Sequence, residues 1–187
     1  MFSWQDQILI GTVLAGSSIV KPPKGKNCYL SMRDKNSKWL QYKMETMTDY
    51  FKTTKLHRYS NSYRCNSACC PRLTELRKVL YHENERAVVF EILDPMQSVG
   101  LAIWYVDGGG KTGRGKKNVY LNTTKFGEKG SNTVCEYFQT LFNPRWGGCS
   151  VNRNGNNRWR VLLDVNASFK FLSIIANDLP TFMFHKL

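Results

Sequence analysis

The chain has 187 residues, of which 42% are hydrophobic and 13% aromatic, and this apolar content excludes a wholly disordered protein. Its formal net charge is +13, which the two halves share: 15 Lys/Arg against 9 Asp/Glu up to Asp94, and 12 against 5 after it. A body that is evenly basic and rich in aromatic residues is typical of nucleic-acid binders.

The first half predicts a helix, two strands, a helix, two strands and a helix. The opening helix spans about 4–15, and the Pro/Gly-punctuated segment 21–26 is a turn. Polar and apolar residues alternate over 28–33, which predicts a half-buried strand. A second helix over about 39–51, strand signals over 55–66 and a third helix opened by Pro71 complete this half.

The second half repeats this order after a linking segment at 82–95. Its predicted elements are a second apolar helix after Pro95, a strand at 118–122, a helix at 132–142, a strand and Gly/Asn-rich turn at 147–157, a strand with one basic face from Arg158, a helix at 169–176 and a tail at 183–186. We therefore predict an α+β fold of two pseudo-symmetric αββαββα repeats, 1–94 and 95–187, with antiparallel sheets.

Two similar apolar runs lie half a chain apart. Leu-Ile-Gly-Thr-Val-Leu-Ala-Gly-Ser occupies 9–17, and Leu-Ala-Ile-Trp-Tyr-Val-Asp-Gly-Gly occupies 101–109. Each predicts a helix that ends in small residues, and Gly16 matches Gly108 in position. An internal repeat of this kind indicates that the fold is built from two similar units.

The two runs resemble the paired signature helices of the LAGLIDADG homing endonucleases. The resemblance implies that these helices pack side by side at the centre, with Gly11 and Ala102 allowing a close approach. In that family each run ends in an acidic residue that holds a catalytic divalent cation such as Mg²⁺. Here Gly16 and Gly108 stand at both acidic positions. The resemblance therefore implies a site-specific DNA endonuclease in which both metal ligands are lost.

Loss of both carboxylates is expected to abolish cleavage and to spare DNA binding. Matched loss suggests deliberate inactivation, and natural decay into an inactive or maturase-like protein is the alternative. Asp107 keeps the first of two aspartates typical of the second motif, but it is rotated by about 100° from position 108 and is not expected to replace that ligand. Changing Gly16→Asp and Gly108→Asp together is expected to restore Mg²⁺-dependent cleavage, as a small change at two helix ends.

The resemblance also assigns candidate residues near the helix ends and on the sheets. Arg86 and Lys186 lie in segments similar to family segments and are candidates for polarising water or stabilising charge. The open sheet faces are predicted to read base edges with Tyr29, Ser31, Arg33, Arg64, Asn118, Tyr120, Asn122, Arg153, Arg158 and Arg160. Loop cations predicted to contact phosphates are Lys24, Lys26, Lys111, Arg114, Lys116 and Lys117.

Several alternatives remain at the level of the sequence. A non-catalytic nucleic-acid binder, such as an intron RNA maturase of the same fold, would share these features. The six cysteines are expected to be reduced, mostly buried thiols, and a zinc-stabilised module using Cys65, Cys69 and Cys70 is the alternative. No secretory signal or long apolar run is present, so we expect a protein that is not secreted and binds no membrane. It would act inside a cell, in the cytoplasm, an organelle or a phage-infected cell, as a monomer on double-stranded DNA.

Overall fold

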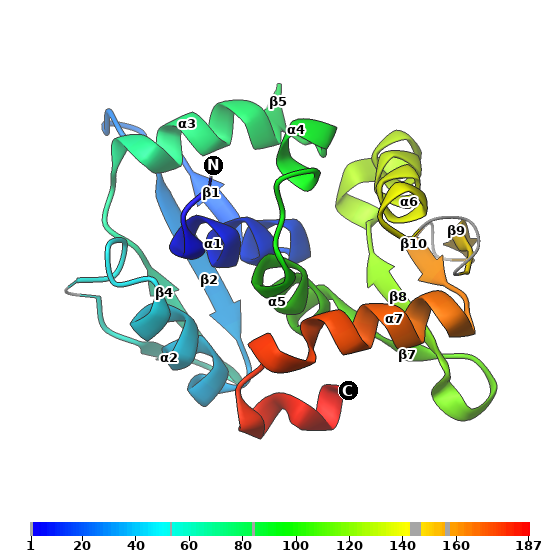
Figure 1. Ribbon diagram of the computed structural model, residues 1–187. Coiled ribbons are helices and arrows are strands. Elements are labelled where there is room, and N and C mark those ends of the chain that lie inside the picture. The colour runs from blue at the N-terminus through cyan, green and yellow to red at the C-terminus, as the bar shows by residue number, and fades with distance from the viewer. Residues whose placement is uncertain (1, 53, 84, 143–146, 156–157) are drawn as a thin grey trace.

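The computed structural model describes residues 2–52, 54–83, 85–142, 147–155 and 158–187. Two halves flank a central pair of helices (Figure 1). The elements of the first half are α1 (Trp4–Ala15), β1 (Ser18–Val20), β2 (Tyr29–Asp34), α2 (Ser37–Thr46), β3 (His57–Tyr59), β4 (Ser62–Asn66) and α3 (Pro71–Leu80). Its four strands form an antiparallel sheet in the order β1-β2-β4-β3.

A short hairpin and helix connect the halves: β5 (Tyr81–His82), β6 (Glu85–Arg86) and α4 (Phe90–Leu93). The second half contains α5 (Ser98–Gly108), β7 (Gly109–Thr112), η1 (Arg114–Lys116), β8 (Asn118–Asn122), η2 (Thr124–Phe126), α6 (Gly127–Phe142), β9 (Cys149–Asn154), β10 (Arg158–Leu163), α7 (Val165–Ile175), η4 (Ala176–Asp178) and η5 (Thr181–Lys186). Its sheet has the order β7-β8-β10-β9 and is also antiparallel. The predicted αββαββα order is therefore confirmed in both halves.

Helices α1 and α5 contact each other at two glycines. A Cβ atom on Gly11 would lie 2.3 Å from the carbonyl oxygen of Gly100, so the two backbones touch at this point. The expected close approach of the two helices is present: its nearest contact joins Gly11 to Gly100, and Ala102 is fully buried in α5. Both helices are buried along nearly their whole length, and they form the shared centre of the core.

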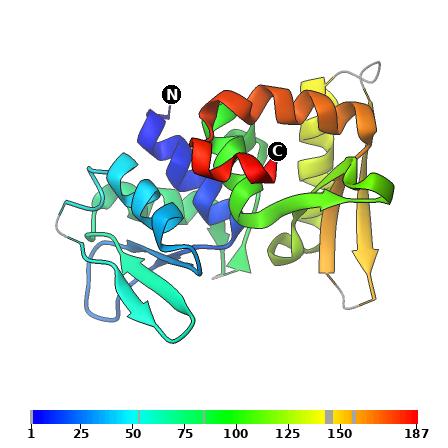
Figure 2. The same ribbon diagram turned by 90° about the horizontal axis from the view of Figure 1, so that it is seen from below.

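The two sheets lie on the same side of the molecule, to either side of the central helices (Figure 2). In β2 the side chains of Leu30 and Met32 are fully buried, and in β8 those of Val119 and Leu121 are buried too. Their neighbours along each strand, among them Tyr29 and Tyr120, belong to the opposite face. Each sheet therefore has one face covered by helices and one open face.

Several boundaries differ from the sequence predictions. The second helix ends at Thr46, whose hydroxyl bonds back to two preceding carbonyls; Tyr50 and Phe51 follow it as buried residues outside the helix. Helix α6 begins five residues earlier than expected. Strands β1 and β7 were not located from the sequence. In the case of β7, the strand opens with two glycines, which have low strand propensity. Part of the predicted turn, residues 156–157, lies outside the described residues.

In the described residues, no helix is long and apolar enough to cross a membrane. All six cysteines are free thiols.

Candidate nucleic-acid interface and helix-end centre

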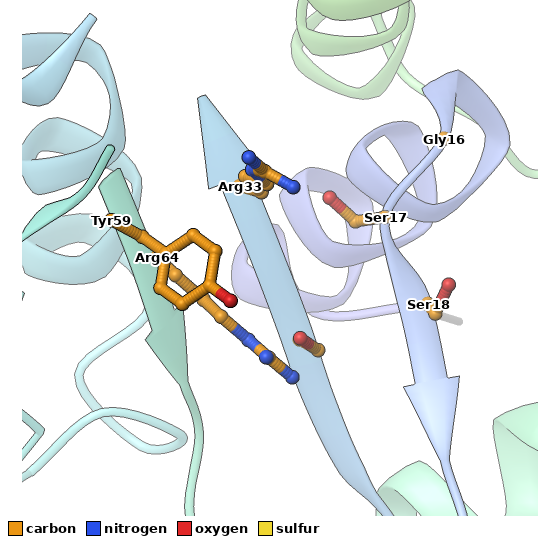
Figure 3. Close-up of a pocket in the computed structure, with 7 residues that line it drawn as sticks. Gly16, Ser17, Ser18, Arg33, Tyr59 and Arg64 are labelled. Atoms are coloured by element: carbon orange, nitrogen blue, oxygen red, sulfur yellow. The ribbon is translucent and has the colours of Figure 1, made fainter. Parts of the chain in front are cut away.

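The open face of the first sheet forms a polar pocket of about 350 Å³. Strand register places Ser31 opposite Ser18, and Arg33 opposite Arg64, so these side chains share one face. Tyr59 joins them from β3 (Figure 3). The pocket extends from this face to the end of α1, because Gly16 and Ser17 also line it. A cationic sheet surface therefore continues directly to the first helix end.

Contacts with neighbouring side chains hold Arg33 in place. Its Nε donates a hydrogen bond of 2.7 Å to the Ser62 hydroxyl. Its guanidinium carbon lies 5.5 Å from the centre of the Tyr59 ring, within cation–π range. Tyr59 is itself 63% exposed. The result is a positioned guanidinium beside an exposed aromatic ring, an arrangement suited to phosphates and bases.

The second sheet presents a matching face. Arg160 pairs in register with Asn122 on one side and Asn152 on the other, and its guanidinium lies 4.6 Å from the Tyr120 ring centre. Asn118 instead donates a hydrogen bond of 3.0 Å to the Leu163 carbonyl, so its amide is partly used within the fold. The sequence did not identify Asn152, because only the pairing of β9 with β10 shows that it shares a face with Arg160.

Two predicted contact residues lie elsewhere than expected. Lys111 was predicted at a loop tip, but it lies within β7 and pairs with Val119, on the helix-covered side of the register. Arg153 was predicted on the open face, but it pairs with Trp159, on the side of buried Val161. Its guanidinium lies 5.3 Å from the Trp159 ring centre. Lys111 was misplaced because β7 was not predicted as a strand, and Arg153 because alternation alone does not say which face of a strand is covered.

The remaining predicted contact residues lie where the sequence placed them. The exposed loop cations lie between β1 and β2, and between β7 and β8: Lys24, Lys26, Arg114, Lys116 and Lys117. Tyr29, Ser31, Arg33, Arg64, Tyr120, Asn122, Arg158 and Arg160 lie on the open side of the register. Their contacts with a nucleic acid stay a prediction.

The first helix end is a glycine cap surrounded by cations. Gly16 has φ 147° and ψ −14°, and the amides of Gly16 and Ser17 donate to the carbonyls of Val13 and Thr12. This is the Schellman hydrogen-bond pattern, which favours glycine at the residue with positive φ. Arg86 donates to the carbonyls of Val13 and Gly16 at 2.7 and 2.9 Å. These bonds satisfy the negative end of α1, where a cation is favourable.

A second cation reaches the same carbonyl from the other half of the chain. Lys125, which follows β8, donates from Nζ to the Gly16 oxygen at 2.7 Å. The same Nζ lies 3.5 Å from the position of a Cβ at residue 16. Partial desolvation of the ammonium and the neighbouring Arg86 guanidinium lower the pKa of Lys125 below its ordinary value. Lys125 was missed by the sequence reading, since no local signal links it to a residue 109 positions away.

The second helix end is built differently. A Cβ on Gly108 would lie 3.0 Å from Cα and 3.2 Å from the carbonyl oxygen of Ala15. Asp107 is bound by Lys43 at 2.6 Å and by the indole N–H of Trp39. The Lys43 and Asp107 side chains are only 2% and 10% exposed. Asp107 therefore ties α5 to α2 as part of a buried ion pair.

These helix ends do not fit a divalent cation. Position 16 offers only its carbonyl oxygen, and two cationic side chains already bind it. Asp107 faces a buried ammonium. Throughout the described ranges, no group of three His, Cys, Asp or Glu side chains could hold a metal ion, and this includes the cysteines proposed as zinc ligands. The expectation that aspartate at 16 or 108 is a small change is also wrong, given the positive φ and the contact with Ala15.

Arg86 and Lys186, the two remaining candidates, lie near different helix ends. Arg86 binds the last turn of α1 and the Ser18 hydroxyl. Lys186 lies in η5, where its carbonyl accepts a hydrogen bond of 2.6 Å from the Tyr105 hydroxyl of α5. That bond fastens the C-terminal segment to the second signature helix. A role of either side chain in chemistry stays a prediction.

A family model described as the LAGLIDADG DNA endonuclease family matches residues 6–171. The homing endonuclease I-WcaI bound to its DNA recognition sequence is similar in structure, with a TM-score of 0.86 and 19% identity over 98% of this chain and 85% of that chain. I-DmoI in complex with DNA and Mn gives a TM-score of 0.61 and 10% identity, over 94% and 98% of the two chains. Full-length DUF199/WhiA from Thermatoga maritima gives 0.58 and 11%, over 99% and 60%. No curated protein sequence gives a significant match.

Proposed function

The chain belongs to the LAGLIDADG DNA endonuclease family, and from that membership we propose that it binds a specific DNA duplex through both sheets without cutting it. The observation that carries the proposal is the pair of helix ends. Both lack a side-chain carboxylate at the positions where the motif has acids, and one end is filled by Lys125 and Arg86.

Binding is supported by the open faces of the two sheets. Each presents arginines beside tyrosine rings, Arg33 with Tyr59 and Arg160 with Tyr120. The major groove of B-DNA admits a two-stranded ribbon, and such side chains can bond to base edges there. The loop cations at 24, 26, 114, 116 and 117 extend both faces and are suited to phosphate contacts. I-WcaI, similar in fold, is described as bound to its DNA recognition sequence.

The chemistry of phosphodiester hydrolysis supports the proposed absence of cleavage. The metal-dependent reaction requires a divalent ion that activates water and stabilises the charge on the leaving oxygen. Hard cations such as Mg²⁺ require oxygen ligands, usually carboxylates. I-DmoI has been determined with DNA in the presence of Mn and of Ca. In this chain the matching positions supply no carboxylate, so we assign no Mg²⁺ to it and no hydrolytic step.

We further propose that residues 1–94 and 95–187 act as two repeats, each holding one half-site. Because both repeats lie on one chain, the active species is a monomer. A DNA ligand places its action inside a cell, in whichever compartment holds that DNA.

The test is a selection for binding that does not depend on cleavage. Duplexes from a random pool are recovered with the purified protein, sequenced, and then incubated with it in Mg²⁺ or Mn²⁺. We expect one enriched sequence family, bound and left intact. Cleavage of that sequence would overturn the loss of activity. Failure to enrich any duplex, together with tight binding of a structured RNA competitor, would replace this function with an RNA-binding one.

A further inference from the structure

The Lys125 ammonium lies directly beside the position from which a side chain at residue 16 would project. A Cβ built on Gly16 meets one described atom within 4 Å, and that atom is Lys125 Nζ at 3.5 Å. The lysine comes from the second half, whereas Gly16 belongs to the first. A positive charge therefore lies next to the position at which the motif of the first half has a carboxylate.

The geometry leaves this ammonium able to bind an anion. A lysine ammonium has three N–H donors, and the Gly16 carbonyl accepts one of them. Lys125 is exposed, and Arg86 lies on the same carbonyl with its own bonds directed at Val13 and Ser18. The pocket on the first sheet begins at the same residue, Gly16. Lys125 thus stands at the junction between the cationic sheet face and the centre of the molecule.

We propose that Lys125 is a resident cation at the centre of the DNA-binding face, where it contacts the central phosphates in place of a divalent ion. The inference rests on the proposed function, because it assumes a bound duplex that spans both halves. The affinity of the protein for the centre of the duplex then requires no metal ion. A fixed ammonium on the Gly16 carbonyl supplies the charge that a divalent ion would otherwise supply.

The first measurement is the affinity for the selected duplex in a chelator, in Ca²⁺ and in Mg²⁺, at matched ionic strength. The wild-type protein should bind equally in all three. Lys125→Met should lose about tenfold in affinity, the low end for a hydrogen bond between charged groups that stays partly exposed. Its log–log salt slope should shrink by about 0.9, the value for one phosphate contact. Lys125→Arg should recover most of the affinity, and Lys129→Met, an exposed lysine on α6, should leave it unchanged.

The second measurement separates a phosphate contact from a structural role as the cap of α1. Methylphosphonates replace the central phosphates of the duplex, which removes their charge. The wild-type affinity should then fall to that of Lys125→Met, whose own affinity should not change further. An equal loss by Lys125→Met on both duplexes would show a structural effect and overturn the inference.

Two other results also overturn the inference, and they differ in what they say of the proposed function. If the wild-type protein binds its duplex but requires a divalent ion to do so, Lys125 is not the central cation and the proposed function stands. If no duplex is bound under any condition, the inference and the proposed function fail together.

Discussion

Aspartate at positions 16 and 108 should destabilise this protein, although it would restore the acids of the motif. At Gly16 the φ of 147° is one that L-residues rarely adopt, and such backbone strain costs about 1–3 kcal/mol. At Gly108 a Cβ meets backbone atoms of Ala15 at 3.0 and 3.2 Å, and overpacking of this kind costs about 1–3 kcal/mol. The double variant should therefore lose about 2–6 kcal/mol if the two costs add.

Such a loss is a large part of the stability of a typical domain, about 5–15 kcal/mol. For a chain of this size each kcal/mol lowers Tm by about 2–4 °C, so the double variant should melt about 4–24 °C lower. Thermal unfolding of both single variants and the double variant, followed by circular dichroism, measures the costs and their coupling. Gly16→Ala and Gly108→Ala isolate the backbone effect from the added charge.

A matched control is Gly155→Ala, because a Cβ there meets no described atom within 4 Å. It should change stability by no more than about 0.5 kcal/mol. At temperatures where it is folded, the double variant should still leave its duplex uncut, in contrast to the restored cleavage expected from the motif alone, because the new carboxylate at position 16 would lie beside the Lys125 ammonium. An unchanged Tm, or efficient cleavage in Mg²⁺, would refute the reasoning that these helix ends exclude carboxylates.

Four further results are expected. Arg33→Ala and Arg160→Ala should each reduce discrimination between the selected duplex and random DNA by about 1–3 kcal/mol, measured by competition binding; an equal loss on both DNAs would indicate phosphate contacts only. Lys43→Met should cost about 3–5 kcal/mol in urea unfolding, because it leaves the carboxylate of Asp107 buried without its partner; a change under about 1 kcal/mol would contradict the ion pair. Burial raises the pKa of Asp6, but hydrogen bonds to its carboxylate outweigh this and hold the pKa below its ordinary value. The stability that the ionised carboxylate contributes at neutral pH should therefore be lost as the pH falls below about 4. Measurement of Tm against pH should show a smaller acid loss in Asp6→Asn. Sedimentation without DNA should give a monomer near 21.6 kDa, and a mass near twice that value would contradict a single-chain pseudo-dimer.

The order of elements could be predicted from the sequence because local patterns determine it. Helix α1 was placed at its observed bounds, since its apolar run over 8–15 ends at Gly16, and the structure adds that Ser3 caps its first turn. The repeat of the motif then set the architecture of the second half. Alternation along the predicted strands identified most residues of the two open faces, but the face of Arg153 required the pairing of β9 with β10, and Lys111 lies in a strand that was not predicted.

The helix-end centre could not be predicted in the same way. The sequence identified Gly16 and Gly108 as the positions that matter, but not what surrounds them. The Lys125 bond to Gly16 and the Lys43 bond to Asp107 join residues 109 and 64 positions apart. Such contacts depend on how the two halves pack, and no periodicity within either half reports on that packing.

The two helix ends differ within one molecule, and a single chain permits this difference. In a symmetric homodimer every substitution is present in both subunits, so a lysine beside one helix end would also lie beside the equivalent helix end of the other subunit. Here an ammonium crosses from the second repeat to the first helix end, whereas the second end has a buried ion pair, with Ala15 at the position of α1 that matches Asp107. A single chain can thus evolve each side of its two-fold axis independently, and its DNA site need not be a palindrome.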